Sequence, residues 1–169
     1  MSTDVPLRVP ANRVSPAALW LWVAEGALGW LIVAGVVVGV TLALPGDLPA
    51  PGPALVTAAR WLLVPLAVVA IAVEPVWRYR VHRWEVTRDA VYTLEGWLNR
   101  TWRIVPVARI QTVDTTRGPL QQVLGLASIS VRTASHAGST SIKHLPAQTA
   151  EAVAHDLGMR ANAVRDEAT

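Results

Sequence analysis

Cysteine is absent from this sequence of 169 residues, and charged residues make up only 16% of it. Without cysteine the chain cannot form a disulfide-stabilised scaffold, a cysteine-ligated zinc or iron–sulfur site, or a thiol nucleophile. An ordinary soluble domain has about 25% charged residues. The shortage of charge, with 52% hydrophobic residues and a mean hydropathy of +0.36, therefore excludes a wholly soluble composition.

A strong net charge is also missing, because 15 Lys and Arg residues stand against 12 Asp and Glu residues. The net charge is only +3, so the isoelectric point near 10.2 reflects an arginine-rich set of bases and not a large positive field. The helix expected at residues 146–157 carries Glu151 and Asp156 but no Lys or Arg. Nucleic acid is therefore not an expected partner.

The hydrophobic residues are concentrated in two runs. Residues 18–44 contain a single charge, Glu25, and exceed the roughly 20 apolar residues that cross a bilayer core. The second run, residues 54–74, contains Arg60 and Pro65. A connection rich in proline and glycine, PGDLPAPGP, separates the runs. We expect a transmembrane hairpin over residues 18–76, with a kink at Pro65.

Arginines flank the two runs on one side only. The first 17 residues, expected to be a flexible tail, contain Arg8 and Arg13, and the connection between the runs contains no Lys or Arg. Four more arginines follow the second run: Arg78, Arg80, Arg83 and Arg88. Basic residues favour the cytoplasmic side, so we expect both termini in the cytoplasm and a multi-pass membrane protein. The alternative is a cleaved signal peptide ending near Ala43, but the first run is longer than the roughly 7–15 apolar residues of such peptides.

Two charges and two glycines of the hairpin are candidates for contacts inside the membrane. Glu25 is expected about 10 Å from the cytoplasmic face of the bilayer, and Arg60 about 10 Å from the opposite face. The two residues therefore cannot pair within one hairpin. Arg60 is expected to reach the outer interface, and Glu25 to face another helix, a partner protein or a wet boundary. Gly35 and Gly39 form a GxxxG pattern, which suits packing on the second helix and dimerisation equally.

From residue 82 onward, short alternating runs separated by turn residues predict a β-sheet. After Gly118-Pro119, the sequence LQQVLGL has helical spacing and predicts a short helical turn. A final amphipathic helix is expected from Pro146 to Leu157, with Gly158 as its cap and residues 161–169 as a fraying tail. The expected strands cover residues 83–87, 90–98, 102–107, 109–116, 128–132 and 140–145, with Pro106 marking a strand end or a sheet edge.

The stretch IVPVARIQTVDTTRGPLQQVLGLASISVRTA resembles the bacterial PH-like domain of the YdbS type, a family formerly described as a domain of unknown function. A strand, an Arg-Ile-Gln-x-Val-Asp segment, a short helix and a further strand occur in the family's order. The resemblance covers residues 77–159, and the two preceding helices match the usual architecture. It implies a bacterial plasma-membrane protein whose cytoplasmic domain, residues 77–160, is a strongly bent antiparallel sheet or barrel capped by a C-terminal helix.

Aromatic residues and arginines alternate directly after the second run, in WRYRVHRW. One interpretation is that they only fix the topology and anchor the helix. The other is non-specific contact of Arg78, Arg80 and Arg83 with anionic lipid head groups. A second polar group, Arg109, Gln111, Asp114 and Arg117, either lines an interaction surface or caps and pairs locally, and we favour the local role.

No catalytic residue, metal site or cofactor site is expected. The four histidines, His82, His136, His144 and His155, lack the spacing of metal ligands. No nucleophile elbow, P-loop or dinucleotide-binding motif occurs, and the carboxylates are scattered. The sequence therefore predicts a non-enzymatic membrane protein that acts through protein–protein or protein–lipid contact, with a membrane protein or a related PH-like protein as partner. The alternative is a subunit of a transport or resistance complex that packs through its transmembrane helices.

Overall fold

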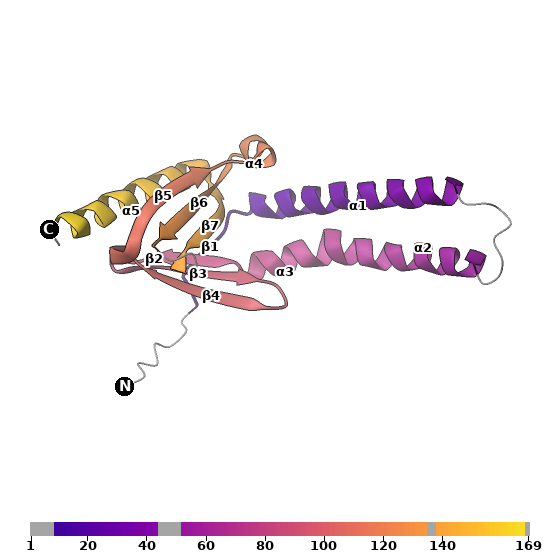
Figure 1. Ribbon diagram of the computed structural model, residues 1–169, viewed down its shortest axis with the longest axis horizontal. Coiled ribbons are helices and arrows are strands. Elements are labelled where there is room, and N and C mark those ends of the chain that lie inside the picture. The colour runs from indigo at the N-terminus through magenta and orange to yellow at the C-terminus, as the bar shows by residue number, and fades with distance from the viewer. Residues whose placement is uncertain (1–8, 44–51, 135–137, 168–169) are drawn as a thin grey trace, which may run out of the picture. The chain divides into compact units, whose positions relative to one another are not determined.

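The computed structural model describes residues 9–43, 52–134 and 138–167 (Figure 1). The chain divides into two compact units. Leu19–Val76 form the first unit, which we call the hairpin, and Met1–Ala18 with Trp77–Thr169 form the second, which we call the domain. The chain therefore enters and leaves the hairpin from the same domain.

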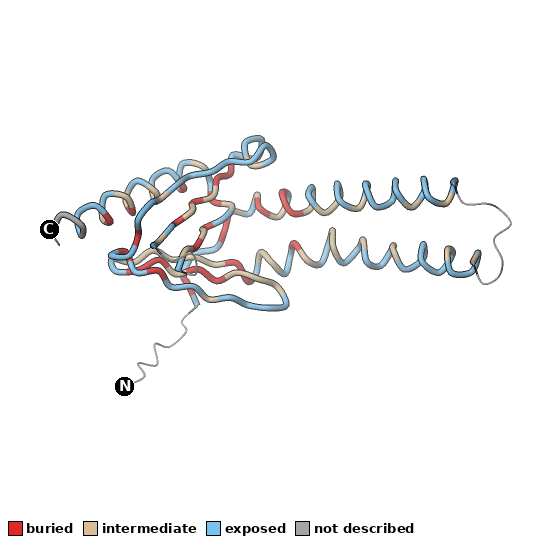
Figure 2. The backbone as a smooth tube through the Cα atoms, viewed as in Figure 1, coloured by how far each residue is buried: buried red, intermediate tan, exposed pale blue. Residues whose placement is uncertain are grey.

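Two long helices make up the hairpin. The first, α1, covers Ala17–Ala43, and the second runs without interruption over Gly52–Val81. By length and composition both could cross a membrane. Most of their apolar side chains are exposed in the structure, as the pale blue tubes of Figure 2 show. Such a surface is stable only in an apolar solvent, which agrees with the predicted transmembrane hairpin.

The second helix continues past the end expected at Glu74-Pro75. It consists of α2 (Gly52–Val68), a π-helical turn (Val69–Val73) and α3 (Glu74–Val81). Within the π-helical turn, the Glu74 N–H bonds to the carbonyl of Val69, five residues back. Proline normally disrupts a helix because it lacks an N–H and its ring meets a preceding carbonyl. The wider π-helical turn, which ends two residues before Pro75, allows the helix to pass that residue.

The domain contains two antiparallel sheets (Figure 1). The first has the strand order β1-β2-β3-β4, with β1 at Asn12–Arg13, β2 at Arg83–Val86, β3 at Ala90–Gly96 and β4 at Arg100–Pro106. The second has the order β5-β6-β7, with β5 at Ile110–Thr116, β6 at Leu126–Thr133 and β7 at Thr140–Pro146. A 3-10 turn (Val107–Arg109) links the sheets, α4 (Pro119–Val123) follows β5, and α5 (Ala147–Glu167) ends the described chain.

One hydrophobic core joins the two sheets and α5. Its largest fully buried side chains include Val91 and Val105 from the first sheet, Ile129 and Ile142 from the second, and Leu157 from α5. A buried hydrogen bond of 2.8 Å between the hydroxyls of Thr93 and Thr140 also connects β3 to β7. The predicted fold class, a helical hairpin followed by an antiparallel β domain capped by a C-terminal helix, is confirmed.

The structure differs over residues 9–17 from the flexible tail expected for the first 17 residues, of which residues 1–8 lie outside the described part of the chain. Residues 12–13 form β1, in which Arg13 pairs with Arg83 of β2. Val14 is only 5% exposed, and the Trp84 indole N–H donates to the Arg13 carbonyl. A two-residue strand has no periodicity that could reveal it in the sequence. The segment that precedes α1 is therefore an edge strand of the domain.

The C-terminal helix is also longer than expected. Gly158 was the expected cap, but α5 continues through it to Glu167. Ala161 extends the apolar stripe of Ala150 and Leu157 and is 4% exposed, which anchors the additional turns on the core. Glycine in a helix interior costs only about 1 kcal/mol relative to alanine, so contacts of the later turns with the core can offset it.

Candidate functional site

The three candidate arginines, Arg78, Arg80 and Arg83, lie where α3 joins β2, and the structure adds a fourth. Arg13 is the direct cross-strand partner of Arg83, and its guanidinium lies 6.0 Å from the centre of the Tyr79 ring. That distance is within reach of a cation–π contact. The sequence could not identify Arg13 as part of this group, because the pairing depends on a strand that has no sequence signal.

Three of the four arginines in this group lack an acidic partner within the described residues. Among the residues that the structure describes, Arg13, Arg80 and Arg83 make no ion pair with an Asp or Glu side chain. Like charges directly opposite each other on neighbouring strands repel and destabilise the pair. An anion near Arg13 and Arg83 would relieve this repulsion.

Two histidines lie in a polar network beside the arginines. The carbonyl of His144 accepts the Ser15 N–H at 3.0 Å, and its Nδ1 lies 3.1 Å from the amide nitrogen of Gln121. Burial, together with the neighbouring Lys143 charge, lowers the pKa of His144 to about 4. Burial also lowers the pKa of His82, whose Nδ1 contacts the Arg78 carbonyl. Both rings are therefore neutral at pH 7, and His144 ties the segment before α1 to β7.

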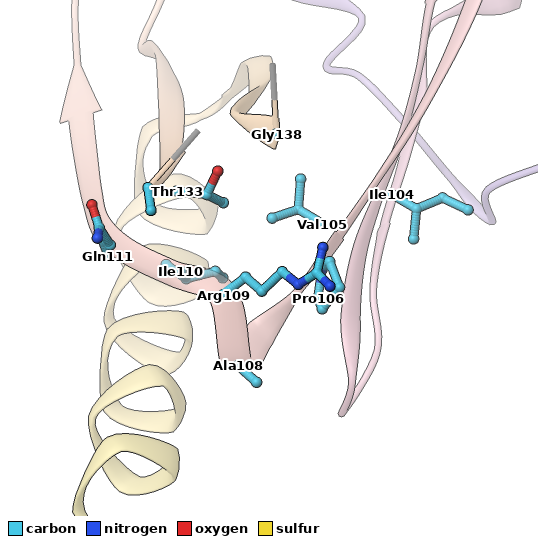
Figure 3. Close-up of a pocket in the computed structure, with 10 residues that line it drawn as sticks. Ile104, Val105, Pro106, Ala108, Arg109, Ile110, Gln111, Thr133 and Gly138 are labelled. Carbon is cyan, nitrogen blue, oxygen red and sulfur yellow. The ribbon is translucent and has the colours of Figure 1, made fainter. Parts of the chain in front are cut away.

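A cavity opens at the corner between the two sheets (Figure 3). Its volume is about 640 Å³, and its walls are mainly apolar. The core side chains Val105 and Ile110 line it, and Figure 3 shows the Arg109 side chain extending toward Pro106. The remaining lining residues are Ile104, Ala108, Gln111, Thr133, Ala134 and Gly138. We call this space the corner cavity.

The strands on either side of the corner cavity are edge strands. β4 is last in the order of the first sheet, and β5 is first in that of the second. Within the described residues, neither strand pairs with another strand along its outer edge. Unpaired strand edges are templates for the addition of an extended segment. A register irregularity between Ile110 and Thr112 of β5 adjoins the cavity, as is common next to binding sites.

The four polar residues for which a local role was favoured fall into two groups. Asp114 pairs with Arg132 at 3.6 Å, and Arg117 forms an ion pair with Glu151, so both have the local role. In contrast, Arg109 and Gln111 line the corner cavity. Within the described part of the chain Arg109 makes no ion pair.

Inside the hairpin, a different glycine from those expected makes the closest approach. A Cβ on Gly26 would lie 3.3 Å from the Ala70 carbonyl oxygen, so α1 contacts the π-helical turn there. No atom lies within 4 Å of the corresponding positions at Gly35 and Gly39, so these two glycines do not pack on the second helix. Glu25 is exposed and has no ion pair within the described residues, and the same is true of Arg60.

No group of three or more His, Asp or Glu side chains that could hold a metal ion exists within residues 9–43, 52–134 and 138–167. Three described carboxylates of the domain, Glu95, Asp114 and Glu151, each pair with a basic side chain. The geometry therefore offers surfaces for binding, among them the corner cavity with Arg109 and the surface that carries Arg13, Arg80 and Arg83.

Comparison with known proteins agrees with this arrangement. The family model described as "Bacterial PH domain" matches residues 17–161, which includes the hairpin as well as the domain. The chain is also 29% identical over 130 residues to "UPF0699 transmembrane protein YdbS" of Bacillus subtilis (strain 168). This alignment covers 74% of the present chain and 77% of that protein. No solved structure matches the chain.

Proposed function

This chain belongs to the bacterial PH domain family, and we propose that it is a non-enzymatic interaction protein of the bacterial plasma membrane. Its hairpin anchors the domain on the cytoplasmic side, where the corner cavity holds an extended segment of a partner membrane protein or of a related PH-like protein. The observation that carries this proposal is the apolar corner cavity between two unpaired strand edges.

Three properties of the cavity suit an extended peptide. Its volume of about 640 Å³ lies within the range of roughly 300–1,000 Å³ typical of binding pockets. The free edges of β4 and β5 can supply main-chain hydrogen bonds, which give affinity in strand addition, while the apolar walls accept a side chain. Arg109 supplies a positive charge for a carboxylate of the partner. The expected segment therefore combines an apolar side chain with a nearby acid.

Site-specific photo-crosslinking in native membranes tests the proposal. A photoreactive amino acid replaces Ala134, which is exposed and lines the cavity, and a matched one replaces Val123 on α4, which is 84% exposed. We expect a discrete protein adduct from position 134 and none from position 123. Arg109→Glu should abolish the adduct, whereas Arg88→Glu, an exposed arginine of the β2–β3 turn, should leave it intact.

An adduct that survives Arg109→Glu would show that the cavity is not the contact. Equal adducts from positions 134 and 123 would mean non-specific collisions. Either result contradicts the proposal, since only a partner seated in the cavity depends on both its walls and its charge.

A second candidate function rests on Glu25. This acid is exposed on α1 and lacks an ion pair within the described residues, which is costly in a membrane unless another helix supplies a partner. The chain would then be a subunit of a larger membrane complex. Glu25→Gln should dissociate such a complex on native gels of mild-detergent extracts, with Arg60→Gln as the comparison. Unchanged migration of Glu25→Gln would exclude this role.

A further inference from the structure

The turn between β3 and β4 lies at the end of the first sheet where the chain connects to both transmembrane helices. Leu94 of β3 pairs with Arg83, the first residue of β2, and Arg83 pairs with Arg13, the last residue of β1. β3 continues for two residues beyond Leu94 before the turn begins. The turn therefore extends beyond the end of β1, which leads to α1, and beyond the start of β2, which follows α3.

The tip of this turn exposes apolar surface, and its side chains are not part of the hydrophobic core. Leu98 is 76% exposed, and Trp97 beside it is half-buried. The turn has a fixed shape, because Gly96 has φ +118° and a Cβ there would lie 1.8 Å from the Asn99 carbonyl oxygen. A tightly shaped turn that exposes a leucine beside a half-buried tryptophan is unfavourable in water and suits contact with an apolar medium.

Basic residues surround the tip. Arg100 is exposed at the start of β4, directly after the turn, and Arg13 and Arg83 form the neighbouring cross-strand pair. None of the three has an acidic partner within the described residues. The acid that precedes Gly96, Glu95, is already paired with Lys143 at 3.2 Å. The end of the sheet therefore combines an apolar tip with unneutralised positive charge.

We propose that the β3–β4 turn inserts Trp97 and Leu98 into the interface of the bilayer that the hairpin spans, while Arg100, Arg83 and Arg13 contact the phosphates of anionic lipids. Tryptophan favours the head-group region, and bases near an anionic leaflet are attracted to it. The hairpin tethers the turn beside this surface, so even a weak contact is populated. This contact is separate from the corner cavity, which lies at the opposite end of β4.

The lack of cysteine makes a clean test possible with the full chain. Leu98→Cys carries an environment-sensitive fluorophore and is reconstituted into vesicles of phosphatidylcholine and phosphatidylglycerol in equal parts. The matched control is Asp89→Cys, in the exposed β2–β3 turn at the other end of the same sheet. We expect blue-shifted emission at position 98 that lipids with a nitroxide near the head group quench. Position 89 should report water and escape quenching.

The arginines are tested on the labelled Leu98→Cys chain. Combining Arg13→Gln with Arg83→Gln should reduce the inserted fraction, because each base near the surface changes this equilibrium by about fivefold at low salt. Arg132→Gln, which removes an exposed arginine that pairs with Asp114, is the control and should leave quenching unchanged. Vesicles of phosphatidylcholine alone should show weaker quenching at position 98.

Four outcomes would overturn the proposal. The first is water-like emission at position 98, and the second is quenching of positions 89 and 98 to the same extent. The third is blue-shifted emission that nitroxide lipids do not quench, because protein would then cover the tip. The fourth is quenching at position 98 that ignores the arginine pair. All of these readouts are independent of partner capture at the corner cavity, so the proposed function can fail while this contact stands.

Discussion

At the scale of single residues, positions with a left-handed backbone conformation restrict most strongly which amino acids the domain accepts. His144 is the one described residue other than glycine with a positive φ, at 57°, and Gly96 and Gly125 share that sign. Such conformations disfavour side chains, above all β-branched ones. His144 retains its conformation because the polar network around Ser15, Gln121 and Ser128 holds it on both sides.

Gly96→Ala should be strongly destabilising. The added Cβ would meet the Asn99 carbonyl oxygen, a backbone atom that cannot move away cheaply. We expect a loss of about 2–4 kcal/mol, or failure of the β3–β4 turn to form, measured as thermal unfolding of the chain in detergent micelles. Gly118→Ala is the matched control, because no atom lies within 4 Å of its Cβ position. Equal effects of the two substitutions would show that the turn is not shaped by Gly96.

The stability of the domain should depend on pH through His144. Its folded pKa of about 4 lies below the ordinary value of 6.5, so the unfolded chain binds the proton first as pH falls. Stability is therefore fully present above pH 6.5 and is lost between pH 6.5 and 4. Because the ring is partly exposed, we expect a loss of about 1–2 kcal/mol across that window. Unfolding temperatures measured from pH 7.5 to 4.5 test this.

Two substitutions at His144 separate its titration from its backbone role. Asparagine tolerates a left-handed conformation and does not titrate, so His144→Asn should fold and show a weaker dependence on pH. His144→Val should be destabilised at every pH, because a β-branched side chain is strained at φ 57°. If His144→Asn retained the full dependence on pH, the titration would have to come from other groups, such as His82.

At the scale of elements, the two ends of the described chain are more ordered than their sequences indicate. β1 has only two residues and α5 passes through Gly158, and both are held by contacts with distant parts of the domain. β1 pairs with β2, about 70 positions away, and Ala161 reaches the common core. Long-range burial of this kind leaves no local pattern.

The extension of α5 can be tested with a matched pair of alanines. Ala161→Asp would place a charge where the side chain is only 4% exposed, whereas Ala163 on the same turn is exposed. We expect Ala161→Asp to cost about 3 kcal/mol in free energy of unfolding and Ala163→Asp less than about 0.5 kcal/mol. Similar small effects at both positions would mean that the last turns of α5 do not pack on the core.

At the scale of the whole molecule, the surfaces of the hairpin and of the domain suit different solvents. Apolar side chains cover the outside of α1 and α2, while those of the domain gather in one core and its ion pairs lie at the surface. Because the domain contains Arg13 before the hairpin and Arg83 after it, we expect a membrane-spanning hairpin to return the chain to the side from which it entered.

Accessibility of single cysteines tests this topology in intact cells. A membrane-impermeant maleimide should label Asp47→Cys, in the connection between the helices, without permeabilisation. It should label Asp89→Cys only after the membrane is opened, because Asp89 belongs to the domain. The cysteine-free parent is the control. Labelling of Asp89→Cys in intact cells would place the domain outside and contradict the orientation inferred from the arginines.

Much of the fold could be predicted from local sequence patterns. Residues 18–44 and 54–74 were recognisable because a membrane span needs only length and apolar composition, and the core strands because alternation is a local property. The candidate site could be predicted from the sequence only in part. Arg83 was identified from its neighbours in sequence, but Arg13 joins it only across a strand pair, and Arg109 gains significance only from the unpaired edges of β4 and β5.

The amino-acid sequence by itself determined that the chain has two long apolar helices, that arginines flank this pair but are absent from the connection between its helices, and that a β domain with a terminal helix follows. These are properties of composition and short-range period, which each segment carries alone. The tertiary structure decided that the segment before α1 is part of the domain, that Arg13 meets Arg83, and that a cavity opens between β4 and β5. Each of these depends on residues far apart in sequence, whose meeting is set by the register of strands and the packing of one shared core.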